Sequence, residues 1–232
     1  MESNPRATRL PVPLAAALPV AFTLLLALAT AIGELLALAE QPGGSTAIDS
    51  SITTWFVAHR TPALTLIARD LSTVGSQAVL TPLTAIAMTA LVVRRRRVAA
   101  GLLAAAWGGA IGLYMLAKQL VDRTRPPAHL WLTNVGRTPS FPSGHATQSL
   151  ATLGALTLVA TARLPGARVP AAAGAAILTL AIGCSRVYLG VHWATDVVAG
   201  WLLAASWLVI VLGLTRGVLA GAQRPEEGAA RD

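Results

Sequence analysis

Charged residues are scarce in this chain: Asp, Glu, Lys and Arg make up 12% of its 232 residues, whereas hydrophobic residues make up 54%. Ordinary soluble domains carry roughly 25% charged residues, which they need in order to cover their surface. The shortage excludes a soluble globular protein and indicates an integral membrane protein. The net charge of +8 is spread over loops rather than along one face, so we expect no nucleic-acid partner.

Cysteine and lysine each occur once, as Cys184 and Lys118. A single cysteine excludes an internal disulfide, and we expect Cys184 to be a small packing residue. Every other basic residue is arginine. The compact ammonium group of Lys118 is not interchangeable with a planar guanidinium group, which makes this position a candidate for function.

Long apolar runs are abundant, and several approach or exceed the roughly 20 residues that cross a bilayer as a helix. Alternating patterns typical of transmembrane strands are absent, so we expect an all-α polytopic membrane protein. The first run, which follows Arg6 and Arg9 and ends near "ALAE" at 37–40, also resembles a secretory signal, but it is longer than a usual signal core. We expect six transmembrane helices, at 14–39, 72–93, 98–117, 146–162, 170–190 and 196–215.

The arginines predict the orientation of these spans. If both termini lie on one side, that side carries eleven of the eighteen basic residues, including the short "VRRRRV" loop at 93–98. Short basic loops next to span ends favour the cytoplasm. We therefore expect a multi-pass plasma-membrane protein with cytoplasmic tails at 1–13 and 216–232, and one membrane domain at 14–215.

One outward segment, residues 47–71, is too polar to cross the bilayer and too apolar for a free loop. Such a composition is typical of an amphipathic helix that lies in the membrane interface. We expect an interfacial helix here, between the first and second spans.

The remaining outward connections collect a mixture of charges that no other joint contains. The stretch "KQLVDRTRPP" begins the first of them, "PSFPSGHATQS" ends it, and "SRVYLGVHWATD" forms the second. Charged groups close to hydrocarbon cost ~2.5–3.5 kcal/mol each on insertion scales, so a functional reason is needed. The residues brought to one bilayer depth are Lys118, Arg125, His145, Arg186, His192 and Asp196.

These residue types fit phosphoryl transfer. His192 and Asp196 are four residues apart, so on a helix they share one face, and a carboxylate on one imidazole nitrogen leaves the other free as a nucleophile. Three cations can hold a phosphate and stabilise its charge. The "PSGH" composition at 142–145 is that of a helix start whose free N–H groups can bind an anion.

The three stretches also resemble the signature motifs of the type 2 phosphatidic acid phosphatase (PAP2) superfamily, which includes the vanadium haloperoxidases. They read K-x6-R-P at 118–126, P-S-G-H at 142–145 and S-R-x5-H-x3-D at 185–196, without substitution and in the family's order. The resemblance extends over the six spans, to residues 14–215.

The resemblance implies a role for each matching residue. His192 would form a phosphohistidine, Asp196 would orient it, and His145 would protonate the leaving group and then activate water. The phosphoryl oxygens would be bound by Lys118, Arg125, Arg186 and the main-chain N–H groups of Ser143 and Gly144. The family requires no metal, and the outward joints offer no carboxylate cluster of metal-binding type, so we expect no metal and no cofactor.

The implied enzyme is a membrane lipid phosphatase acting at the outer membrane face, with a lipid phosphate as substrate and membrane lipids as surroundings. Undecaprenyl diphosphate, phosphatidylglycerol phosphate and phosphatidic acid are the candidates, and an outward site favours the isoprenoid diphosphate. Two alternatives are a vanadate-dependent haloperoxidase, which the six spans disfavour, and a non-catalytic phospholipid binder or transporter, which would not need both histidines.

For Asp122 and Arg123, inside the first motif, we expect a local salt bridge rather than catalysis. The sequence leaves the oligomeric state open.

Overall fold

The computed structural model describes residues 12–39, 46–136 and 138–221. Within those ranges it contains eight α-helices, one short 3-10 helix and no strand, so the predicted all-α class is confirmed. Residues 1–11 and 222–232 of the predicted tails, and five of the arginines used above to predict orientation (Arg6, Arg9, Arg137, Arg224 and Arg231), lie outside the described residues. The described part of the tail predicted at 216–232 continues the last helix as far as Gly221.

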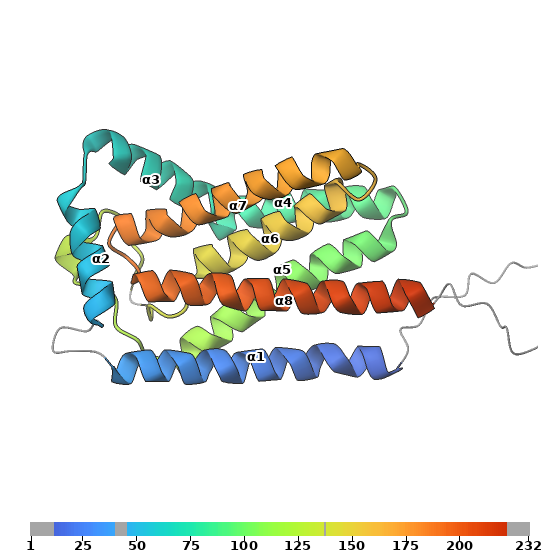
Figure 1. The fold of residues 1–232 in the computed structure, drawn as a ribbon, viewed down its shortest axis with the longest axis horizontal. Helices are drawn as coiled ribbons and strands as arrows, with labels where there is room; N and C mark the ends of the chain where they lie inside the picture. The colour runs from blue at the N-terminus through green and yellow to red at the C-terminus, as the bar shows by residue number, and fades with distance from the viewer. Residues whose placement is uncertain (1–11, 40–45, 137, 222–232) are drawn as a thin grey trace, which may run out of the picture.

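Six helices run along a common bundle (Figure 1): α1 (Val12–Leu38), α4 (Gln77–Val93), α5 (Arg97–Leu120), α6 (Gly144–Ala160), α7 (Pro165–Tyr188) and α8 (Ala194–Gly221). The helix α2 (Ala47–Ala58) lies across one end of this bundle, and α3 (Pro62–Val74) leads from there into α4. The short helix η1 (Ala128–Leu130) belongs to the connection between α5 and α6.

Four of the helices, α1, α5, α7 and α8, are long and apolar enough to cross a membrane. The pair α3 and α4, bent by 42° at its break, makes a fifth candidate span. Of the six predicted spans, only the one at 146–162 has no such helix, because α6 has 17 residues. Since α6 packs against α5, α7 and α8, its buried polar residues Gln148 and Thr152 face protein rather than lipid.

The segment 47–71, predicted as one interfacial helix, forms two helices with a break at 59–61. The break has a local cause. Pro62 occupies the first turn of α3, and the hydroxyl of Thr61 caps this helix by accepting a hydrogen bond of 3.2 Å from the N–H of Leu64. A residue before proline disfavours the helical region, so α2 cannot continue through Thr61.

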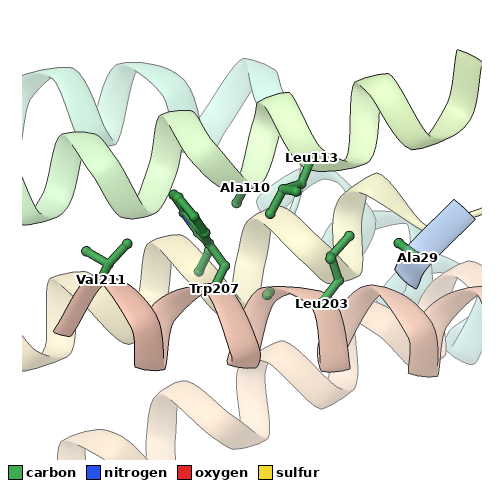
Figure 2. Close-up of a cluster of buried hydrophobic side chains, with 8 residues drawn as sticks. Ala29, Ala110, Leu113, Leu203, Trp207 and Val211 are labelled. Atoms are coloured by element: carbon green, nitrogen blue, oxygen red, sulfur yellow. The ribbon is translucent and has the colours of Figure 1, made fainter. Parts of the chain in front are cut away.

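Small residues and one large aromatic hold the bundle together. Figure 2 shows Trp207 of α8 pointing toward α5, close to Ala110. Its indole N–H donates to the main-chain oxygen of Ala105 at 2.9 Å, and its ring meets Phe22 of α1 edge to face. A Cβ atom on Gly109 would come within 2.2 Å of the indole ring, so close approach of α5 and α8 requires glycine there.

The outer surface of the bundle is apolar. Leu24 and Leu35 of α1 and Leu202 and Val209 of α8 each leave 63–68% of their surface exposed. A soluble protein rarely exposes such a set on adjoining helices, and hydrocarbon is the surrounding that such a surface fits.

Candidate active site

The predicted site residues lie at one end of the bundle, the end that α2 covers. The helices α5 and α7 end there, and α6 and α8 begin there (Figure 1). Four helix termini therefore meet, which gathers residues that are far apart in the sequence.

A tight turn after α7 brings Arg186 and His192 to the same place. Gly190 adopts the left-handed conformation with φ of 74°, which glycine tolerates and other residues rarely adopt. A Cβ atom there would also lie 2.4 Å from the main-chain oxygen of Leu130. The N–H of Val191 donates to the carbonyl of Arg186 at 3.2 Å, so the chain closes α7 sharply and turns back into the bundle.

A pocket of about 410 Å³ occupies this end of the bundle. Its wall includes residues from all three sequence motifs. The predicted site residues in the wall are Lys118, Arg125, Gly144, His145, Arg186 and His192.

Main-chain and hydroxyl oxygens hold the three cations of the pocket. The ammonium group of Lys118 donates to the carbonyls of Pro139 (2.6 Å) and Ser140 (3.2 Å). Arg125 donates from Nε to the carbonyl of Thr138 at 2.8 Å, and Arg186 donates to the hydroxyl of Ser72. Within the described part of the chain, none of the three forms an ion pair with a carboxylate. Their positive charge remains available for an anion in the pocket.

The imidazole of His192 lies between a carboxylate and a guanidinium group. Its Nδ1 is 3.5 Å from Oδ2 of Asp196, and its Nε2 is 3.3 Å from Nη1 of Arg125. The side chain is buried, and burial, followed by the charges of Lys118, Arg125 and Arg186, lowers the pKa of His192 well below its usual 6.5. His192 is therefore neutral at physiological pH, the form in which an imidazole can attack phosphorus.

Asp196 is held by a buried network that extends to α2. Its carboxylate accepts hydrogen bonds from Nη1 of Arg123 (2.6 Å), from the N–H of Trp193 (2.9 Å) and from the hydroxyl of Ser140. The second terminal nitrogen of the same guanidinium group, Nη2, donates to Oδ2 of Asp49 in α2 at 2.8 Å. Burial alone would lower the pKa of Arg123, but the two carboxylates outweigh it and raise the pKa.

This network corrects the expectation of a local salt bridge for Arg123. It forms ion pairs with Asp49 and Asp196, which lie 74 and 73 residues away in the sequence, and none of the three side chains is exposed. Thr195 adds to the link, because its N–H and hydroxyl donate to Asp49 at 3.0 and 2.7 Å. Arg123 thus ties the first turn of α2 to the carboxylate that faces His192.

The sequence matches the profile of the PAP2 superfamily over residues 98–218, which is more than half of the chain and contains all three motifs. The chain belongs to the PAP2 superfamily. It is 41% identical over 73 residues to an undecaprenyl-diphosphatase of Sulfolobus acidocaldarius, covering 30% of each protein. It is 39% identical over 89 residues to a decaprenylphosphoryl-5-phosphoribose phosphatase of Mycolicibacterium smegmatis, covering 37% of this chain and 43% of the relative. The chain thus spans less than half the length of these curated relatives.

Two crystal structures share the fold of this PAP2 chain. A transmembrane PAP2-type phosphatidylglycerolphosphate phosphatase from Bacillus subtilis superposes with a TM-score of 0.69, covering 89% of this chain and 98% of the other at 24% identity. LpxE from Aquifex aeolicus superposes with a TM-score of 0.59, covering 73% of this chain and 98% of the other, also at 24% identity. At 24% identity, these superpositions show a shared fold and no more.

The two main-chain N–H groups predicted to bind phosphate, those of Ser143 and Gly144, have different surroundings. The main-chain N–H of Ser143 is already used, because it donates to the main-chain oxygen of Asp196 at 3.0 Å. Ser143 is fully buried, its hydroxyl has no hydrogen-bond partner, and it is not among the residues of the pocket wall. The N–H of Gly144, which does line the pocket, remains a candidate phosphate ligand.

His145 occupies the pocket wall on the first turn of α6, and Ser72 of α3 lines the same pocket. It lines the same pocket as His192, which lies not on a helix, as expected from its spacing to Asp196, but in the turn between α7 and α8. A group of three or more His, Cys, Asp or Glu side chains suited to a metal ion does not occur in the described ranges.

Proposed function

We propose that this PAP2 protein is an integral-membrane phosphatase that hydrolyses a phosphate monoester or diphosphate lipid through a phosphohistidine. The observation that supports the proposal best is that one pocket is lined by His145, His192 and three cations that pair with no carboxylate among the described residues. A neutral nucleophile, a second histidine and excess positive charge are what transfer of a dianionic phosphoryl group requires.

In the first step, Nε2 of His192 attacks phosphorus, and the bond from phosphorus to the leaving oxygen breaks. The negative charge of the bound phosphate favours the protonated form of His145, which gives its proton to that oxygen, so the leaving group departs as an alcohol or as a protonated phosphate. Asp196 faces Nδ1 of His192 at 3.5 Å. It favours the tautomer with a proton on Nδ1 and a free electron pair on Nε2.

In the second step, a water molecule attacks the phosphohistidine, and His145 accepts the proton that the water loses. The phosphorus–nitrogen bond breaks, inorganic phosphate leaves, and neutral His192 is restored. Lys118, Arg125 and Arg186 bind the phosphoryl oxygens in both steps and stabilise the charge of the transition states. In this scheme the three cations take the electrostatic part that Mg²⁺ takes in other phosphoryl transfers, and no metal participates.

The arrangement of the helices supports an active site on the outer face of the plasma membrane, with both termini in the cytoplasm. The loops that carry Arg94–Arg97, Arg163 and Arg168 join helices at the bundle end opposite the pocket (Figure 1), and short basic loops favour the cytoplasmic side. In this orientation α6 is the sixth, protein-enclosed span, α2 lies at the outer interface, and α3 leads from there into the candidate span that it forms with α4.

The test is phosphate release by the purified full-length protein from undecaprenyl diphosphate, phosphatidylglycerol phosphate, phosphatidic acid and diacylglycerol diphosphate. We expect release from at least one lipid, and loss of that release in His192→Ala. Absence of release from every lipid, by protein that is folded in detergent, would refute the proposal.

A further inference from the structure

The pocket has an uncharged part that the phosphoryl-transfer chemistry does not use. Beyond the cations and histidines, its wall includes Tyr114 of α5, Gln148 of α6, and Ser76 and Gln77 at the start of α4. Together they provide hydroxyl and amide groups from three different helices.

Contacts place these groups together. The amide Nε2 of Gln77 donates to the hydroxyl oxygen of Tyr114 at 2.6 Å, which leaves the hydroxyl hydrogen of Tyr114 free to donate elsewhere. The Tyr114 ring lies against the start of α6, because a Cβ atom on Gly144 would be 2.9 Å from its Cε2 atom. Gln148 follows Gly144 by four residues and shares its helix face.

Gln148 is the informative member of this set. Its side chain is 1% exposed, and its amide Nε2 has no hydrogen-bond partner in the part of the chain that the structure describes. A buried, unpaired amide donor destabilises the protein, and such groups call for an explanation in a ligand or in ordered water. Because Gln148 lines the pocket, a ligand in the pocket can satisfy this donor.

We propose that this uncharged subsite binds a hydroxyl-bearing linker, such as a glycerol or sugar unit, between the phosphate that is removed and the lipid. The proposal rests on the proposed phosphatase function and names its substrate class. It differs from the isoprenoid diphosphate that an outward-facing site favours.

The chemistry of the subsite distinguishes a hydroxylated linker from a second phosphate. Tyr114, Gln148, Gln77 and Ser76 carry groups that both donate and accept hydrogen bonds, as hydroxyl groups do, whereas an ionised phosphate only accepts. Among the described residues that line the pocket, the cations are the three already assigned to the transferred phosphate. A second phosphate would meet neutral groups, while a polyhydroxyl linker would match them.

The pocket also reaches the surface where such a linker must leave it. Thr73 and Gln77 line the pocket and are exposed, and they flank the break between α3 and α4, which together form a candidate membrane span. A lipid whose phosphate lies against the cations can thus extend past the neutral groups toward the bilayer.

The test compares two lipids that share a diacylglycerol tail and a terminal phosphate monoester. Phosphatidylglycerol phosphate has a glycerol-containing linker, and phosphatidic acid has none. We expect Gln148→Leu and Tyr114→Phe each to lower kcat/KM on phosphatidylglycerol phosphate by roughly threefold to tenfold, the range of one neutral hydrogen bond. On phosphatidic acid, undecaprenyl diphosphate and p-nitrophenyl phosphate, kcat/KM should change by less than about twofold, because these substrates present no hydroxylated linker to the donors.

Thr152→Val is the matched control. Thr152 lies one turn beyond Gln148 on α6, is buried, and also has an unpaired polar atom, but it does not line the pocket. We expect it to leave the ratio of the two lipids unchanged. Equal loss on all substrates, no loss on any, or a loss confined to undecaprenyl diphosphate would each overturn the linker proposal. Absence of phosphate release by the unmodified protein would instead refute the phosphatase function itself.

Discussion

Arg123 donates a hydrogen bond of 2.6 Å to Asp196 at a place where neither side chain is exposed to solvent. The same guanidinium group donates to Asp49, so one buried cation pairs with two buried carboxylates. One of them faces His192, and the other belongs to the helix that covers the end of the bundle. The orientation of Asp196 is thereby linked to the docking of α2.

Replacing Arg123 with methionine should strongly destabilise the protein. Removing one member of a buried ion pair leaves an uncompensated charge, at a typical cost of about 3–5 kcal/mol. We expect a large drop in the unfolding midpoint in detergent, together with a loss of kcat as Asp196 moves. Adding Asp49→Asn should recover part of the stability, because it removes one of the two unpaired charges.

Arg60→Met provides the control for that experiment. Arg60 also holds two segments together, but its partners are the carbonyls of Tyr188 and Leu130 rather than carboxylates. Its loss leaves no buried carboxylate without a partner, so we expect a smaller drop in the unfolding midpoint. Equal effects of the two substitutions would show that the Arg123 ion pairs contribute nothing specific.

Replacing His145 and replacing His192 should have different effects on a substrate with a good leaving group. On p-nitrophenyl phosphate, which needs little protonation, His145→Ala should form the phosphoenzyme but hydrolyse it ~10²–10⁴-fold more slowly, the usual loss of acid–base catalysis. Phosphohistidine, labile to acid and stable to base, should accumulate and be detected by trapping. His192→Ala should give none, and Asp196→Asn should be intermediate. Phosphoenzyme formed by His192→Ala would show that the two roles are reversed.

The pH dependence of phosphoenzyme formation should report the low pKa of His192. Because burial and three cations lower that pKa well below 6.5, the native imidazole stays neutral as pH falls through 6.5. Single-turnover phosphoenzyme formation from p-nitrophenyl phosphate should therefore remain flat through that value and decline only at lower pH. A tenfold fall per pH unit beginning at 6.5 would contradict the assignment.

The same group makes stability decrease on acidification. The unfolded chain binds a proton on His192 near pH 6.5, whereas the native chain does not until the pH falls through the lowered pKa. Below pH 6.5 the unfolded state binds more protons, so the free energy of unfolding should fall with pH. His192→Gln, which has no proton to bind, should show a shallower fall in a denaturant titration.

Hydrolysis should persist in excess EDTA. Lys118, Arg125 and Arg186 supply the positive charge that a magnesium ion would otherwise supply. The measurement is phosphate release from the preferred lipid with chelator and after re-addition of Mg²⁺. Activity that EDTA abolishes and Mg²⁺ restores would refute a metal-independent mechanism.

Labelling of intact cells should reveal which face of the membrane carries the active site. With Cys184 first replaced by alanine, Thr133→Cys in the pocket wall should react with an impermeant thiol reagent. Arg94→Cys, at the exposed end of α4, should react only after the membrane is permeabilised. The reverse pattern would place the active site in the cytoplasm.

Sequence patterns predicted the site where the signal is local. The motif histidines and cations lie next to span ends, and the helix termini that carry them meet at one end of the bundle, so Lys118, Arg125, Arg186, His145 and His192 were found correctly as neighbours. The predicted spans at 14–39, 98–117, 170–190 and 196–215 overlap α1, α5, α7 and α8 with ends that differ by at most six residues, because the hydropathy of such helices reports their surroundings. The span predicted at 72–93 instead crosses the break between α3 and α4.

Long-range and neutral polar contacts were not predictable in this way. Asp49 and Arg123 meet only after α2 docks across the bundle end, and no spacing in the sequence signals that pairing. Tyr114 and Gln148 lie in membrane helices, where an isolated hydroxyl or amide is read as packing. The position of α6 between α5, α7 and α8 was not predictable either, because hydropathy cannot show that a helix is enclosed by other helices.

The single lysine of the chain offers a spectroscopic opportunity. Lys118 lines the pocket, and its ammonium group contacts the carbonyls of Pro139 and Ser140. Cells fed lysine enriched in nitrogen-15 at Nζ would therefore yield protein in which one side-chain nitrogen carries the label. Its one magnetic resonance signal needs no mutagenesis to assign, and it would follow the arrival of any anion in detergent, nanodisc or native membrane alike.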